Sequence, residues 1–430
     1  MHVPEVSENG FSRNSTLIWE ETRRPGWMRL LNGVGGLLRR LNLVWPRLTP
    51  ESLMAQAQRR ARLSDFGDDR FREGLRVLVD VFNDQNTAHA FGRIFFREYC
   101  TQLLVNRLRI QADLTRHPEI LDVPIAKPLF ITGPPRSGTT FLHRLMAQDP
   151  ACRTMLYWET VQPSPSPQRE TYRTDPRIAL ARKQVEFLNQ LSPRLAVAHE
   201  FEAESAEEDN GLFAHAFAAG MLGFMFDVPD YVRWLDDQDL IGPYRYLKQQ
   251  LQLLSWKYRG DYWLSKAPAH LFGLDALLTV FPDACVVVMH RDPHKVIPSV
   301  CSLAAALRSI QTDRLDLRRL GSEMVQGLSE GPKRARAARA QLDASHFFDV
   351  SYDQFVANPI GTVRSIHQHF GYDFSPEFES KARRWLAENP ARKHGVHQYS
   401  LGDFGLDSAT IEENFPDDLA WLRTHQAEVR

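Results

Sequence analysis

The sequence is short of cysteine and has almost no excess charge. Its 430 residues include four cysteines, Cys100, Cys152, Cys285 and Cys301, and no CxxC pair. Scattered cysteines of this kind indicate neither a disulfide framework nor a zinc site, and buried thiols in a reducing compartment are the simpler interpretation. The formal net charge of −1 argues against a nucleic-acid-binding protein that depends on bulk electrostatic attraction.

Long hydrophobic runs are missing too. A membrane-spanning helix needs roughly 20 apolar residues, and no stretch reaches that length. His215 interrupts the nearest candidate, residues 212–226, which we predict to be a buried helix. The first ten residues lack the basic start and the apolar stretch of a signal peptide. We therefore expect a cytoplasmic protein with no transmembrane segment.

What is present is ordinary globular composition, with 43% hydrophobic and 24% charged residues, which is enough for one large domain or two unequal ones. Residues 1–125 are predicted to form a helical extension, because apolar residues recur at helical spacing over 27–45, 71–82 and 91–108. The first of these stretches also contains arginines. A basic amphipathic helix can lie on a membrane surface, although packing on a neighbouring helix is commoner.

From residue 126 the pattern changes to short apolar runs that alternate with helical stretches. The runs lie near residues 129–132, 262–265, 285–289 and 347–350. Such alternation predicts an α/β domain over 126–430, in which a parallel, P-loop-like sheet is flanked by helices. A helical insertion at about 160–260 separates the first two runs and is well placed to form a substrate pocket.

The first apolar run opens the most informative stretch, LFITGPPRSGTTFLH at residues 129–143. A buried strand, a tight turn and the start of a helix together point backbone N–H groups at one spot, which favours an anion. Gly133 and Gly138 have the spacing of a P-loop, but Thr139 occupies the position of the lysine in nucleotide-hydrolysing P-loops. The cation lies inside the loop instead, at Arg136.

A second anion-binding pattern follows at residues 285–293, CVVVMHRDP. A predicted strand ends at Arg291, and Ser299 lies on the next helix. Arginine offers a fork of donors matched to phosphate, and a serine hydroxyl adds another. The alternative is that Arg291 forms an ion pair and that Ser299 is an ordinary helix residue.

These patterns resemble the PAPS-dependent sulfotransferase family, whose donor is 3′-phosphoadenosine 5′-phosphosulfate (PAPS). The resemblance covers about residues 128–400. The family's Arg-x-Pro element with a later serine implies that Arg291 and Ser299 hold the 3′-phosphate. The family's 5′-phosphosulfate loop implies contacts from Arg136, Ser137, Gly138, Thr139 and Thr140.

Three more segments match family elements. Lys266, at a predicted strand end, corresponds to a lysine near the bridging oxygen of the donor, where a cation stabilises the leaving phosphate. Tyr352 corresponds to a tyrosine that contacts the nucleotide, and a core tyrosine is the alternative. Arg392 and Lys393 resemble the late basic loop that closes over the 3′-phosphate, with one residue inserted.

The family uses two kinds of general base. Phenol and steroid sulfotransferases have a histidine two residues after the lysine, where this chain has Pro268. Tyrosylprotein sulfotransferases, whose Pro-Arg-Ser-Gly-Thr-Thr loop is also found here, use a later glutamate. We therefore predict Glu159 as the base, with its pKa raised beside Trp158. His270 is the alternative base, and either residue could instead have a structural role.

A cluster of acidic residues interrupts the insertion. Glu200, Glu204 and Glu208 are expected on one face of a helix, where they repel one another, and a solvated face is the simplest interpretation. If this face lined the substrate pocket, it would favour a cationic acceptor.

The resemblance implies an enzyme that transfers a sulfuryl group from PAPS to a hydroxyl (or amine) of a small-molecule, carbohydrate, lipid or peptide acceptor. No metal is expected, because fixed cations replace Mg²⁺. Two alternatives are a P-loop small-molecule kinase, with Asp292 or Asp349 as a metal ligand, and a non-catalytic nucleotide-binding module.

Overall fold

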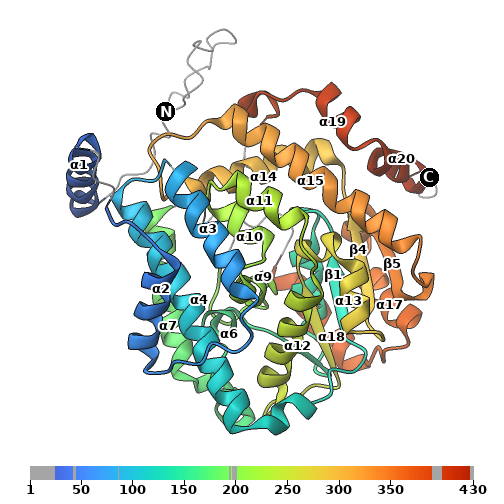
Figure 1. Cartoon of the computed structure of the whole chain (residues 1–430). Coiled ribbons are helices and arrows are strands. Elements are labelled where there is room, and N and C mark those ends of the chain that lie inside the picture. Colours follow the sequence, from blue (N-terminus) through green and yellow to red (C-terminus); the bar gives the residue numbers. More distant parts are fainter. Residues whose placement is uncertain are drawn as a thin grey trace, which may run out of the picture.

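A five-stranded parallel sheet forms the centre of the molecule (Figure 1). The computed structural model describes residues 25–41, 45–85, 87–192, 195, 201–389 and 400–426. The strands, in the spatial order β2-β3-β1-β4-β5, are β1 (Leu129–Thr132), β2 (Cys152–Thr154), β3 (Tyr262–Lys266), β4 (Cys285–His290) and β5 (Phe347–Ser351). The predicted parallel α/β sheet is confirmed, and β2 is an additional short edge strand without an apolar run.

Alternating side chains of β1 face opposite sides of the sheet. Leu129 and Ile131 belong to one hydrophobic cluster, and Phe130 between them belongs to another. Because both faces are covered, the first three residues of β1 are all apolar. Helices contributing to the first cluster are α5 (Thr139–Met146), α17 (Pro359–Phe370) and α18 (Pro376–Glu388), and helices contributing to the second include α12 (Ile241–Ser255) and α13 (Leu274–Val280).

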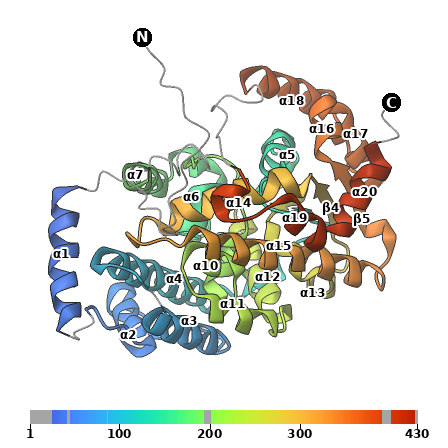
Figure 2. The same ribbon diagram turned by 90° about the horizontal axis from the view of Figure 1, so that it is seen from above.

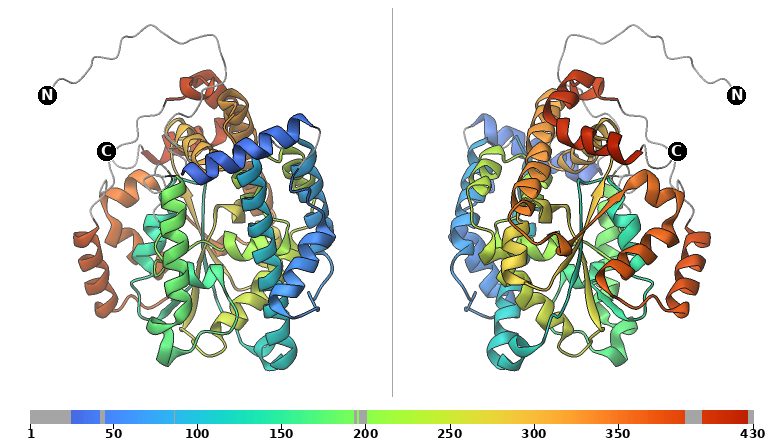
Figure 3. Two further views of the ribbon diagram at one scale, coloured as in Figure 1. Left: turned by 90° about the vertical axis from the view of Figure 1, so that its left-hand side faces the viewer. Right: turned by 90° about the vertical axis from the view of Figure 1, so that its right-hand side faces the viewer.

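The N-terminal helices pack against the insertion (Figures 1 and 3). Their bounds are α1 (Gly26–Arg40), α2 (Pro50–Ala61), α3 (Phe71–Gln85) and α4 (Ala90–Arg116), which confirms the helical periodicity. Leu75 of α3 and Phe96 of α4 belong to the same buried cluster as Phe130 of the sheet. The hydrophobic core therefore runs across the predicted boundary at residue 125.

Two segments of the insertion differ from prediction. Residues 212–226 form no single helix, since Phe217 has a left-handed backbone (φ 53°) that separates α9 (Asn210–Phe213) from α10 (Gly220–Met225). Residues 256–261 connect α12 to β3 without helical structure, so the helical insertion ends before the predicted boundary near residue 260. Nothing in the sequence marks Phe217 for positive φ, because it is not a glycine or an asparagine.

The remaining helices complete the covering of the sheet and the site. They are α6 (Tyr157–Val161), α7 (Pro176–Leu191), α11 (Pro229–Asp236), α14 (Pro293–Arg308), α15 (Leu317–Arg339), α16 (Tyr352–Ala357), α19 (Ser408–Asn414) and α20 (Pro416–Gln426). Among the residues described, none of the helices has the length and apolar character needed to cross a bilayer. The carboxyl ends of β1, β3, β4 and β5 meet at one edge of the sheet, where open α/β sheets bind their ligands.

Candidate active site

The loop after β1 adopts a conformation that needs its glycines. Gly133 and Gly138 have φ values of 147° and 93°, and Arg136 between them has 67°. A Cβ atom at Gly133 would lie 2.6 Å from the carbonyl oxygen of Met289, and one at Gly138 would lie 2.6 Å from Cδ2 of Tyr352. The loop therefore packs tightly on β4 and α16 and leads directly into the N-terminus of α5, which favours anions.

Three of the predicted donor-binding residues meet beside this loop. Arg136 donates from Nε to Oγ of Ser299 over 3.0 Å, and Arg291 donates from Nη1 to the carbonyl oxygen of Arg136 over 2.6 Å. We call Arg136, Arg291 and Ser299 the basic cluster. The guanidinium carbon of Arg291 also lies 4.0 Å from the ring centroid of Tyr352, a cation–π contact that orients it. The structure thus brings together the residues that the sequence singled out from three separate segments.

Polar atoms in this cluster and in the adjacent loop suit an anionic ligand. Ser137 Oγ and Arg291 Nε are buried and have no hydrogen-bond partner within the described part of the chain. Buried polar groups are almost always hydrogen-bonded, so orphaned donors beside a loop of this kind fit a phosphate or sulfate group. These residues therefore fit PAPS.

Lys266 connects the loop to the opposite wall of the site. It is the last residue of β3, and only 1% of its surface is exposed. Its Nζ donates to Oγ1 of Thr140 over 3.1 Å and forms an ion pair with Glu208. A buried ammonium group needs such partners, and this geometry places a glutamate directly beside the predicted position of the leaving phosphate.

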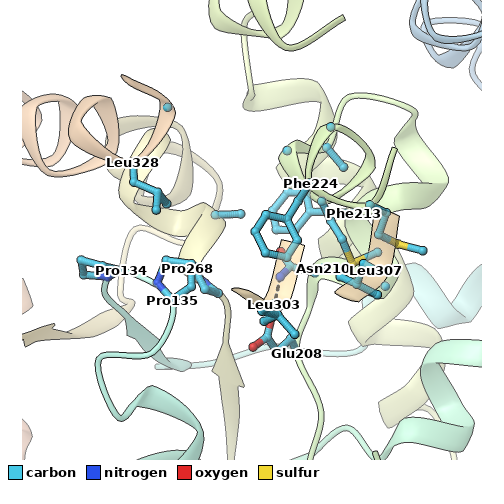
Figure 4. A pocket seen from close by; sticks show the side chains of 18 of the residues that line it. Pro134, Pro135, Glu208, Asn210, Phe213, Phe224, Pro268, Leu303, Leu307 and Leu328 are labelled. Atoms are coloured by element: carbon cyan, nitrogen blue, oxygen red, sulfur yellow. Dashed lines mark hydrogen bonds between the residues drawn. The ribbon is translucent and has the colours of Figure 1, made fainter. Parts of the chain in front are cut away.

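Glu207 and Glu208 both line the site, which corrects the interpretation of their segment as a solvated face. Residues 201–208 form no helix, and the backbone N–H of Glu207 donates to the carbonyl oxygen of Met155 over 2.9 Å. Figure 4 shows Glu208 at the pocket beside Asn210, which donates a hydrogen bond to it. Burial and the adjacent carboxylate of Glu208 raise the pKa of Glu207 to about 7. A carboxylate of this kind can exchange protons near neutral pH.

Glu159, the predicted general base, lies in a closed ion pair. It is fully buried and accepts hydrogen bonds from Tyr172 Oη (2.7 Å), from the backbone N–H of Leu156 (2.9 Å) and from the guanidinium of Arg153. The described residues that line the cavity do not include it. This position does not fit the predicted role, because the carboxylate is fully buried and both of its oxygens accept hydrogen bonds from protein groups outside the cavity lining. Glu159 instead caps the start of α6 and neutralises Arg153.

His270, the alternative base, also points into the core. Its Nε2 lies 3.2 Å from Oδ2 of Asp209 and its Nδ1 lies 3.0 Å from the hydroxyl of Tyr244. The ring of Phe130 packs edge-on against it. Both ring nitrogens are therefore occupied by structural partners. Arg392 and Lys393 lie outside the described residues.

The loop and Glu208, the ion-pair partner of Lys266, form one end of a cavity of about 1460 Å³. Residues of α10, α14 and α15, far along the chain from the loop, line the other end. This lining is mostly apolar, as Figure 4 shows for Phe213, Phe224, Leu303, Leu307 and Leu328, although α14 and α15 also contribute charged side chains such as Arg308 and Glu323. A charged end and a mostly apolar end thus belong to one continuous cavity.

Comparisons with known proteins agree with this geometry. A family model described as "Sulfotransferase family" matches residues 128–376. The chain is 25% identical over 283 residues to the ω-hydroxy-β-dihydromenaquinone-9 sulfotransferase Stf3 of Mycobacterium bovis, with 64% of this chain and 70% of that protein covered.

Two crystal structures resemble most of the molecule. The sulfotransferase STF1 from Mycobacterium tuberculosis is 33% identical, with a TM-score of 0.76, and the match covers 86% of this chain and 98% of that one. The sulfotransferase STF9 from Mycobacterium avium is 31% identical, with a TM-score of 0.81, over 86% and 96% of the two chains. Since the matches extend over 86% of this chain, they also include part of the region before residue 126, for which the sequence suggested no function.

Proposed function

The chain belongs to the sulfotransferase family, and on that premise we propose that it transfers a sulfuryl group from PAPS to a hydroxyl group of a long, apolar acceptor. The observation that supports this proposal is that one cavity extends from the basic cluster to a mostly apolar lining. The basic cluster suits the phosphates of the donor, and the apolar lining suits a hydrocarbon chain.

Glu208, in place of Glu159, is the general base of this proposal. Its carboxylate takes the proton of the acceptor hydroxyl as the oxygen forms a bond to sulfur. The bond from sulfur to the 5′-phosphate breaks, and the electron pair remains on that phosphate. Lys266, Arg136 and the N–H groups at the start of α5 stabilise the charge that develops there. Lys266 holds Glu208 beside the reacting atoms until the donor oxygens compete for its ammonium group.

A lipid hydroxyl is the acceptor class that the cavity supports best. The name of the relative Stf3 states a hydroxylated dihydromenaquinone as its acceptor, and the lining here is rich in phenylalanine and leucine. A cationic acceptor, which the acidic cluster suggested, is disfavoured because Lys266 already neutralises Glu208. The cytoplasmic location is part of the same proposal, since all four cysteines are free thiols, as in a reducing compartment.

A transfer assay tests the proposal. Purified protein is incubated with PAPS and either a long-chain isoprenoid alcohol or a short, water-soluble alcohol, and products that gain a sulfate are detected by mass spectrometry. We expect sulfation of the long-chain alcohol and much slower sulfation of the short one. If ATP–Mg²⁺ raises the melting temperature and 3′-phosphoadenosine 5′-phosphate does not, the result would favour the kinase instead. Nucleotide binding without transfer to either alcohol would favour a non-catalytic module.

A further inference from the structure

Helix α1 presents an apolar stripe to the outside of the molecule. Four of its side chains and the residue after it recur three or four positions apart, and therefore lie on one face. Each is between 51% and 72% exposed, and they are Trp27, Leu30, Val34, Leu37 and Leu41. Large apolar residues are normally exposed singly on a protein surface, and a contiguous stripe of them marks a binding surface.

Specific contacts fix the orientation of this stripe. On the opposite side of α1, Met28 is 2% exposed and Asn32 accepts a hydrogen bond from the backbone N–H of Phe91 over 3.0 Å. A Cβ atom at Gly35 would lie 2.4 Å from Cβ of Ala90, so the glycine permits α1 to approach α4 closely. Figure 2 shows α1 at one edge of the molecule, attached along one side only. The stripe is thus held outward by the packing of the rest of the helix.

The charged residues of the segment that contains α1 are all of one sign. Residues 25–47 contain no aspartate or glutamate, and their arginines are Arg29, Arg39, Arg40 and Arg47. Trp27 and Trp45 are about half exposed at the two ends of the segment. Arginine near apolar side chains, with tryptophan at the margins, is the composition of helices that lie in the interface of an anionic bilayer.

The same helix packs against residues that line the apolar end of the cavity. Met28 belongs to a buried cluster with Leu303 and Ile310, both of which line the cavity. Phe187 of α7 lines it as well and is 42% exposed, so the cavity reaches the surface on this side. Figure 3 shows α1 and α7 on the same face of the molecule. The apolar stripe and the mouth of the cavity therefore face in a common direction.

We propose that α1 docks the protein on the surface of an anionic phospholipid bilayer, so that the acceptor passes from the membrane into the cavity beside α7. The route of the acceptor rests on the proposed function, whereas the docking of α1 does not. Membrane docking adds a reason for the apolar lining, because a lipid that moves directly from bilayer to cavity never exposes its chain to water.

Sedimentation with vesicles tests this proposal on the full chain. The wild type is expected to sediment with vesicles of phosphatidylcholine that contain about one third phosphatidylglycerol. Raised salt, or vesicles of pure phosphatidylcholine, should weaken this binding by about fivefold for each arginine that contacts the bilayer. Leu30→Ser/Leu37→Ser is expected to reduce the partition coefficient by at least about tenfold, since the two exposed leucines then lose their burial in the bilayer. Both positions are open to solvent, so the fold stays intact.

Leu121→Ser is the matched control. Leu121 is also exposed but follows the far end of α4, on the order of 40 Å from α1 at 1.5 Å per residue. Vesicle binding by this variant is expected to equal that of the wild type. Equal loss in both variants, or no sedimentation of the wild type, would overturn the proposal. The latter result is expected if residues 1–24 or a second copy of the chain cover the stripe.

The transfer assay separates this proposal from the proposed function. If both hold, Leu30→Ser/Leu37→Ser slows sulfation of an alcohol embedded in vesicles and leaves sulfation of the same alcohol in detergent unchanged. Docking without any transfer would refute the proposed function alone. If the wild type and Leu30→Ser/Leu37→Ser sulfate the vesicle-embedded alcohol equally fast, the docking route alone is refuted.

Discussion

Two pairs of a glutamate and a buried cation lie in this molecule, and their surroundings differ. Arg153 and Glu159 pair behind α6, where Tyr172 and a backbone N–H complete the hydrogen bonds of the carboxylate. Lys266 and Glu208 pair at the cavity wall, beside the loop that begins α5. The chemistry of the two pairs is nearly the same, but Glu208 lines the cavity, whereas Glu159 is not among the described residues that line it.

This difference shows that burial and charge do not by themselves identify a catalytic carboxylate. A closed ion pair contributes to the fold, since removing one partner leaves the other charge buried and uncompensated. An open pair is available to a reacting hydroxyl. The two pairs can therefore be separated by experiments that measure turnover and stability independently.

The largest expected effect is on turnover. Glu208→Gln is expected to lower kcat by about 10³-fold, because removal of a general base typically costs 10²- to 10⁴-fold. The melting temperature of the variant is expected to fall by less than that of Glu159→Gln, because the side chain of Glu208 is 19% exposed whereas that of Glu159 is fully buried. The control is Glu204→Gln in the same segment, whose exposed ion pair with Arg182 should contribute little. A kcat for Glu208→Gln within threefold of the wild type would contradict the assignment of the base.

The pair of Arg153 and Glu159 predicts the opposite result. Glu159→Gln is expected to lower the free energy of unfolding by about 3 kcal/mol, because Arg153 is left as a buried charge. At a temperature where the variant is still folded, its kcat should be close to that of the wild type. Denaturant unfolding measures the first quantity and steady-state kinetics the second. A large loss of kcat in a variant of normal stability would restore Glu159 as the base.

A smaller effect concerns pH. Lys266, Arg144 and Glu208 face Glu207, and burial with the carboxylate of Glu208 raises its pKa to about 7. The adjacent carboxylates titrate as a unit, so kcat/KM should rise with pH through about 7 as the last proton leaves. Glu207→Gln should move this rise to lower pH.

Stability should respond to pH with the opposite sign. The folded state binds more protons than the unfolded chain between the ordinary pKa of glutamate and about 7. The free energy of unfolding contributed by Glu207 is therefore present below this range and is lost as pH rises through it. Glu207→Gln should reduce the slope of the free energy of unfolding against pH in this range. An identical slope in the variant and the wild type would refute the raised pKa of Glu207.

The donor end of the site was largely predictable from sequence. Short apolar runs predicted four of the strands, and each anion-binding residue followed a strand end within a compact motif. Parallel strands bring such ends to one edge of the sheet, so Arg136 and Arg291 meet although the chain separates them. Only β2 was missed, because its three residues include a charged one and no apolar run.

The base and the acceptor end required the structure. Glu208 was expected on a solvated helix, because the alternation of acidic residues fits helical spacing, but residues 201–208 are held in a non-helical path against Met155. Glu159 was chosen by its position after the first helix, a pattern that says nothing about the partners of a carboxylate. The apolar lining comes from helices that are far apart in sequence, so no local motif predicts it.

The donor site is tested most directly by comparing two nucleotides in one calorimetric titration series. 3′-Phosphoadenosine 5′-phosphate is expected to bind the wild type about 100-fold more tightly than adenosine 5′-phosphate, because charge-assisted hydrogen bonds to the 3′-phosphate contribute roughly 1.5–3 kcal/mol each. Arg291→Ala should reduce this ratio to about tenfold or less. Equal affinities of the wild type for both nucleotides would contradict the assignment of Arg291 and Ser299 to the 3′-phosphate.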